Sequence, residues 1–158
     1  MPTPFPLSWT QRHTAPLLNK HPVMKEQGST SISGKRFIPG IIWFLLVTFL
    51  LCLPGSDLPS TQDWMNLIYF DKWVHIGLFT VLSFLFMWPV LKTDRPHQEK
   101  WNYCLKIAFA AVLYGITTEV IQKYFIPGRS FDLFDWAADS FGALIALTFC
   151  KIRFLKTR

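Results

Sequence analysis

Residues 119–139 read EVIQKYFIPGRSFDLFDWAAD and separate two segments that are apolar enough to lie in lipid. The stretch carries four carboxylates, at Glu119, Asp132, Asp135 and Asp139, together with Arg129. A charged side chain inside the hydrocarbon of a membrane costs about 3 kcal/mol or more unless it is paired or hydrated. We therefore expect these residues to mark a functional site between two membrane-spanning helices.

The composition of the whole chain is typical of a membrane protein. Of its 158 residues, 51% are hydrophobic and only 16% are charged, whereas a soluble domain has about 25% charged residues. Four apolar blocks are each near the roughly 20 residues that a helix needs to cross a bilayer, and they cover residues 37–53, 73–91, 103–118 and 134–150. The sequence predicts an all-α fold, a four-transmembrane-helix bundle that forms one domain over residues 37–158.

We predict that residues 1–36 form a flexible tail that precedes this domain. Prolines, small polar residues and basic residues are scattered through it without a helical or alternating pattern, which is typical of disorder. The tail lacks the apolar core of a signal peptide. Met24 is an alternative translation start, which would leave residues 1–23 untranslated.

The basic residues predict the orientation of the bundle. With four crossings, thirteen of the sixteen lysines and arginines fall in the tail, in the loop after the second block and at the C-terminus. Because such loops stay in the cytoplasm, we expect both termini inside and two acidic segments outside. The net charge of +6 then reflects topology and attraction to anionic lipids, so nucleic acid is not expected as a partner.

This topology brings residues that are far apart in the sequence to one depth near the outer surface. The second helix begins there, the third ends there and the fourth begins there. The candidate site residues are Asp71, Lys72, His75, Glu119, Gln122, Arg129, Asp132, Asp135 and Asp139.

Spacing suggests which of these side chains pair. Asp71 and His75 are four residues apart and share a helix face, so the carboxylate can hold the imidazole. The turn at residues 127–128 returns Arg129 toward Glu119, and we expect these two to form an ion pair. For Lys72 two alternatives stay open, an interaction with lipid phosphate and a pair with an acidic group of another helix.

The predicted fourth helix carries a stripe of polar residues on one face, and small residues continue this stripe further along the helix. Asp132 and Asp135 lie near its N-terminus, where the helix dipole favours carboxylates, but Asp139 lies two turns inside. Residues 142, 143 and 146 continue the stripe as Gly, Ala and Ala, which allows another helix to pack closely. We therefore expect this face, and Asp139 with it, to point into the bundle.

No recognised catalytic or metal-binding motif accompanies these residues. One histidine with scattered carboxylates is a weak metal signature, so neither a metal nor another cofactor is expected. Cys52, Cys104 and Cys150 have no ligand spacing and are interpreted as small apolar residues of the core.

Several short motifs, in order and with matching spacing, resemble the VanZ-like family of small bacterial membrane proteins. They are DKxxH at residues 71–75, ExxQ at 119–122, PGRSFD at 127–132, and Asp135 followed by Gly142. Two departures are Asp139, where the family commonly has Asn, and Ile76, where Phe is common. The resemblance covers roughly residues 41–147 and implies a multi-pass protein of the bacterial cytoplasmic (inner) membrane. The family takes its name from a factor associated with resistance to the glycopeptide teicoplanin, and resemblance alone does not transfer that phenotype.

Three functions are compatible with the charged cluster. The preferred hypothesis is non-enzymatic: the cluster binds membrane lipids, a lipid headgroup, an envelope precursor or an envelope protein at the outer leaflet. The second is an enzyme acting on a lipid-linked envelope precursor, with Glu119 or an aspartate as general base and His75 as acid. A proton-coupled carrier ranks last because the inner halves of the helices are almost wholly apolar.

Overall fold

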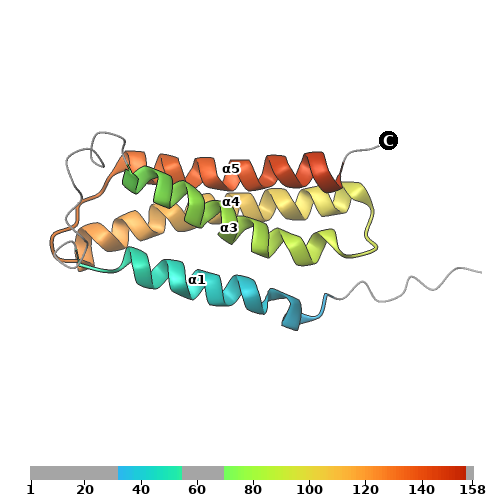
Figure 1. Cartoon of the computed structure of the whole chain (residues 1–158), viewed down its shortest axis with the longest axis horizontal. Coiled ribbons are helices and arrows are strands. Elements are labelled where there is room, and N and C mark those ends of the chain that lie inside the picture. The colour runs from blue at the N-terminus through green and yellow to red at the C-terminus, as the bar shows by residue number, and fades with distance from the viewer. Residues whose placement is uncertain (1–31, 55–69, 156–158) are drawn as a thin grey trace, which may run out of the picture.

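The computed structural model describes residues 32–54 and 70–155. Within these ranges it is all-helical, with a short 3-10 helix η1 (Gly34–Phe37) followed by α1 (Ile38–Leu51), α3 (Phe70–Leu91), α4 (His97–Phe125) and α5 (Leu133–Phe154). The helices lie side by side in a bundle (Figure 1). Four helical segments are long and apolar enough to cross a membrane, which confirms the predicted fold class.

The helices begin and end where the backbone chemistry favours it. Pro39 lies in the first turn of α1, where its missing N–H is not needed. Asp132 caps α5, because its side chain accepts a hydrogen bond from the backbone N–H of Phe134. Between α4 and α5 the chain turns at Gly128, whose φ of 74° suits glycine.

Several helix boundaries differ from the prediction. The first helical turn begins at Gly34 rather than at Phe37, since a 3-10 turn commonly precedes a longer helix. Of the predicted flexible tail, residues 1–31 lie outside the described residues. Helix α4 extends beyond the predicted 103–118 at both ends. The prediction followed the apolar block alone, and the polar residues on either side of that block are also helical.

Helix α3 packs most extensively against α5, and α1 lies against α3 at the edge of the bundle (Figure 1). The two helices approach each other closely at Gly142, which is buried, as are Ala143 and Ala146 in the predicted small stripe. A Cβ at Gly142 would lie 2.5 Å from the Ile76 carbonyl oxygen, and the Thr80 hydroxyl donates to the Gly142 carbonyl at 3.1 Å. This contact sets how near α5 lies to the first turns of α3.

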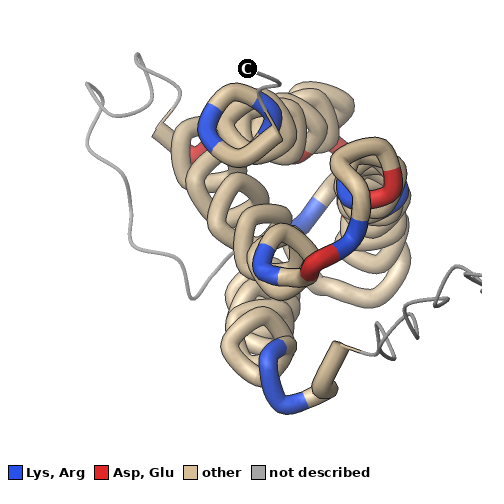
Figure 2. The backbone as a smooth tube through the Cα atoms, turned by 90° about the vertical axis from the view of Figure 1, so that its right-hand side faces the viewer, with Lys and Arg blue, Asp and Glu red and all other residues tan. Residues whose placement is uncertain are grey.

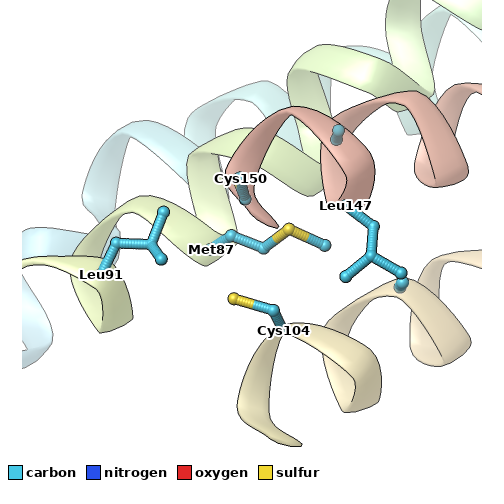
Figure 3. Packing of buried hydrophobic residues seen from close by; sticks show 7 residues of the cluster. Met87, Leu91, Cys104, Leu147 and Cys150 are labelled. Atoms are coloured by element: carbon cyan, nitrogen blue, oxygen red, sulfur yellow. The ribbon is translucent and has the colours of Figure 1, made fainter. Parts of the chain in front are cut away.

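Two apolar clusters fill the interior. One joins α1 to the other helices through Val47, Leu51 and Phe79. The other joins α3, α4 and α5, and Figure 3 shows the Met87 side chain between residues of α4 and α5. Cys104 and Cys150 are completely buried in this second cluster, which confirms their interpretation as core residues.

The two ends of the bundle carry different charges. The end formed by η1, the turn between α3 and α4, and the end of α5 carries Lys35, Arg36, Lys92, Arg95, Lys100, Lys151 and Arg153. Figure 2 faces this end, with basic segments at the helix ends. The opposite end carries the candidate site, and the placement of the basic end in the cytoplasm stays a prediction.

We predict that Gly142→Ala destabilises the bundle. The added methyl group meets backbone of α3 that cannot rotate away, and such overpacking costs about 1–3 kcal/mol. Gly77→Ala is the matched control, because no atom of a packed neighbour in the described ranges lies within 4 Å of its added Cβ and alanine favours the helix. Thermal unfolding in detergent measures both, and equal unfolding temperatures would contradict the close contact.

Candidate functional site

Seven of the nine candidate residues are joined by hydrogen bonds or ion pairs at one end of the bundle. The N-terminus of α3, the C-terminus of α4 and the N-terminus of α5 meet there (Figure 1). Gln122 and Arg129 lie at the same end with other contacts. The residues form two layers, which differ in burial.

The outer layer is the Lys72 cluster, in which Lys72 contacts Asp71, Asp132 and Asp135. The ammonium donates to Asp71 at 2.8 Å and to Asp132 at 2.7 Å, and it also pairs with Asp135. Asp71 lies on α3, whereas the other two belong to α5 and its cap. Of the two alternatives for Lys72, the structure therefore shows the pair with acidic groups of another helix.

Asp132 links α3, α4 and α5. Its side chain caps α5 and accepts a hydrogen bond from Lys72, while its backbone N–H donates to Glu119 Oε2 at 2.8 Å. The hydrogen bond from Lys72 lowers the pKa of the Asp132 carboxyl below its ordinary value. The ionised form of Asp132 is therefore the form that this end of the bundle stabilises.

The inner layer is the buried triad of His75, Glu119 and Asp139. The His75 side chain is 6% exposed and that of Asp139 is completely buried, and Nδ1 of the imidazole lies 2.9 Å from Asp139 Oδ1. The expected pairing of His75 with Asp71 is wrong. Asp71 is 59% exposed and pairs with Lys72. The imidazole of His75 instead points inward toward α5, where it contacts Asp139.

Glu119 is completely buried, and only one of its oxygens is used. Oε2 accepts the Asp132 backbone N–H, whereas Oε1 has no hydrogen-bond partner among the described residues. The same holds for Asp139, whose Oδ2 has none. The inner layer thus contains two buried carboxylate oxygens without a donor.

The expected ion pair between Glu119 and Arg129 is wrong as well. Within residues 32–54 and 70–155, no acidic side chain lies within ion-pair distance of Arg129, and its Nε is buried without a hydrogen-bond partner. The turn at Gly128 delivers the backbone N–H of Asp132 to Glu119 in place of the guanidinium.

Gln122 links α4 to the end of α1 by a hydrogen bond. Its side-chain amide donates to the Leu51 carbonyl at 2.8 Å, which satisfies one of the acceptors that the end of a helix leaves free. Gln122 is therefore a structural contact in this arrangement, although it lies one turn from Glu119.

Sequence reasoning missed Gly115, which lies four residues before Glu119 on α4 and so on the same face. A Cβ at this position would lie 3.0 Å from Asp139 Oδ2. Gly115 therefore makes the space that Asp139 occupies against α4. The spacing Gly-x-x-x-Glu toward the end of an apolar helix is the signal that could have indicated it.

A family model described as VanZ/LLP1 matches residues 37–154. The chain belongs to the VanZ/LLP1 family. This confirms the resemblance that the short motifs indicated, and with the four spanning helices it makes the chain a multi-pass membrane protein of the VanZ/LLP1 family. No curated protein and no solved structure matches the chain.

We predict that Lys72→Met destabilises the protein by about 1–3 kcal/mol, between the values for exposed and buried ion pairs. The substitution leaves three aspartates close together without their cation. Lys123→Met is the control, because Lys123 is exposed at the same end and makes no ion pair within the described ranges. Thermal unfolding in detergent is the measurement, and equal effects of the two substitutions would contradict the role of Lys72.

The lowered pKa of Asp132 predicts how its contribution depends on pH. Because the folded pKa lies below the unfolded value of about 4, the stabilisation is complete above that value. It is lost as the pH falls through the folded pKa. Asp132→Asn retains a helix cap but not the charge, so its unfolding temperature should lie below that of the wild type at pH 7, with the difference shrinking toward pH 3. A difference that is independent of pH would contradict this.

Proposed function

We propose that this end of the bundle binds a zwitterionic headgroup that carries a phosphate and an ammonium group. The source is a phospholipid or a lipid-linked envelope precursor in the outer leaflet of the bacterial inner membrane. The protein acts by binding rather than by catalysis. Its orientation follows from the predicted cytoplasmic location of the basic end.

The charge balance of the Lys72 cluster is the observation that carries this proposal. One lysine faces three carboxylates, so its positive charge is already engaged and the cluster keeps an excess of negative charge. This favours a cation over the anion that Lys72 alone would suggest. Asp71 is 59% exposed and Asp132 37%, and both are therefore accessible to an ammonium group.

Arg129 supports the phosphate part of the proposal. It lies three residues before Asp132 in the chain and has no acidic partner in the described part of the protein. A guanidinium binds phosphate through two parallel hydrogen bonds. An anion at Arg129 and a cation at the neighbouring aspartates match the two charges of a zwitterionic headgroup.

Exposed apolar residues around the same end support a lipid as the carrier of the headgroup. Trp73 on α3 is 64% exposed, Tyr124 on α4 is 68% exposed and Phe134 on α5 is 74% exposed. Aromatic residues favour the boundary between lipid and water. Acyl chains beside these residues would keep the headgroup at the depth of the Lys72 cluster.

Native mass spectrometry of the protein in detergent tests the proposal. Phosphatidylethanolamine, which has both groups, should bind more tightly than phosphatidylglycerol, which lacks the amine. Arg129→Ala and Asp132→Asn should each weaken phosphatidylethanolamine binding about tenfold, as expected for one charged hydrogen bond. Lys123→Ala is the matched control at the same end, and it should leave binding unchanged.

Equal binding of the two lipids, or an unaffected Arg129→Ala variant, would contradict headgroup recognition. Lipids that copurify from bacterial membranes distinguish a phospholipid from a lipid-linked precursor by mass. The His75–Asp139 hydrogen bond beside the unpartnered Glu119 oxygen favours the enzyme as the second candidate. A lipid of altered mass that forms with the wild type but not with Glu119→Gln would establish it.

A further inference from the structure

Three possible metal ligands from three different helices meet in the buried triad. His75 comes from α3, Glu119 from α4 and Asp139 from α5. One ligand atom from each lies within 4.8 Å of the other two. All three residues are buried, with 5%, 0% and 0% of their surface exposed. No second group of this kind occurs within residues 32–54 and 70–155.

The unpartnered oxygens are a separate observation that points to a ligand. Glu119 Oε1 and Asp139 Oδ2 receive no hydrogen bond, and a buried carboxylate without a partner is strongly unfavourable. Glu119 has its other oxygen on the Asp132 backbone, and Asp139 has its other oxygen near His75. A divalent cation or protons on the carboxylates would remove this penalty.

We propose that His75, Glu119 and Asp139 bind a divalent transition-metal ion of the zinc type. One imidazole nitrogen and two carboxylates are ligands that zinc accepts, whereas magnesium and calcium prefer oxygen ligands alone. The two carboxylates cancel the charge of the ion, so that the complex is neutral within the bundle. Three protein ligands leave a fourth position for water or another oxygen ligand.

The distances fit this assignment with a small adjustment. Ligand atoms of a four-coordinate zinc ion on bonds of about 2.0–2.1 Å are about 3.3 Å apart, and His75 Nδ1 lies 2.9 Å from Asp139 Oδ1. The 4.8 Å within which the three ligand atoms lie therefore closes to this spacing with side-chain movements that total about 1.5 Å. Glu119 has the longest carboxylate side chain of the triad and is the residue that moves.

Asp135 would orient the histidine from outside the metal site. Its Oδ2 lies 3.9 Å from His75 Nε2, the nitrogen that remains when Nδ1 holds the ion. A carboxylate that accepts the second ring N–H of a metal-binding histidine is a common arrangement. Asp135 thus connects the metal site to the Lys72 cluster without being a ligand.

The metal site is independent of the proposed headgroup binding. Arg129 and Asp132, which test the headgroup, are not metal ligands, and the three metal ligands are buried beneath the Lys72 cluster. Failure of either proposal therefore leaves the other standing. The sequence alone did not indicate the site, because the three ligands have no common motif spacing.

Zinc content of the purified protein is the first test. Protein without a histidine tag is equilibrated with Zn²⁺, passed over a weak chelator and analysed by inductively coupled plasma mass spectrometry. The wild type should retain about one zinc per chain, as expected for a single site of three protein ligands. His75→Ala, Glu119→Gln and Asp139→Asn should each weaken zinc binding on the order of a hundredfold, and Asp135→Asn about tenfold.

Control variants of a histidine and of an aspartate outside the metal site are available at the opposite end of the bundle. His97→Ala and Asp94→Asn remove an exposed histidine and an exposed aspartate there, and both should retain zinc as the wild type does. Size-exclusion chromatography establishes which variants remain folded. Mn²⁺ and Mg²⁺ are used in parallel, and we expect Mg²⁺ to bind much more weakly than Zn²⁺.

X-ray absorption at the zinc edge keeps the proposal testable even if the variants do not fold. In the wild type it should show one imidazole together with oxygen ligands and no sulfur. Zinc content far below one per chain would mean that protons neutralise the triad, and it would overturn the proposal. So would sulfur ligands, or folded triad variants that retain zinc.

Discussion

The ion pairs of Lys72 hold the acidic ends of α3 and α5 together. Without this cation, Asp71, Asp132 and Asp135 would repel one another at the point where the two helices begin. Because Asp132 also caps α5 and donates its backbone N–H to Glu119, the same interaction positions α4. One lysine therefore organises the contact of three helices at the end that carries the candidate site.

Close helix packing beneath the Lys72 cluster creates the buried layer. Gly142 lets α5 approach the α3 backbone, and Gly115 makes room on α4 for Asp139. Larger residues at either position would hold the helices apart and admit water or lipid between them. The burial of His75, Glu119 and Asp139 thus depends on two residues that have no side chain.

The sequence predicted the helices and the gathering of the polar residues at one end of the bundle, because apolar block length and charge distribution are local properties. It did not predict their partners. His75 pairs with Asp139 rather than with Asp71, which is only one turn away. Glu119 accepts the Asp132 backbone rather than Arg129. Partner choice depends on the rotation of each helix and on the path of the turn at Gly128, which sequence spacing does not determine.

The two layers separate charge neutralisation from recognition. The proposed divalent ion in the buried triad would cancel the charges of Glu119 and Asp139, and protons on these carboxylates would do the same. In either case the Lys72 cluster retains its excess of negative charge, since its three aspartates face one lysine. The proposed preference for an ammonium group would therefore belong to the outer layer, whatever neutralises the inner one. In the proposed headgroup complex, Arg129 would bind the phosphate.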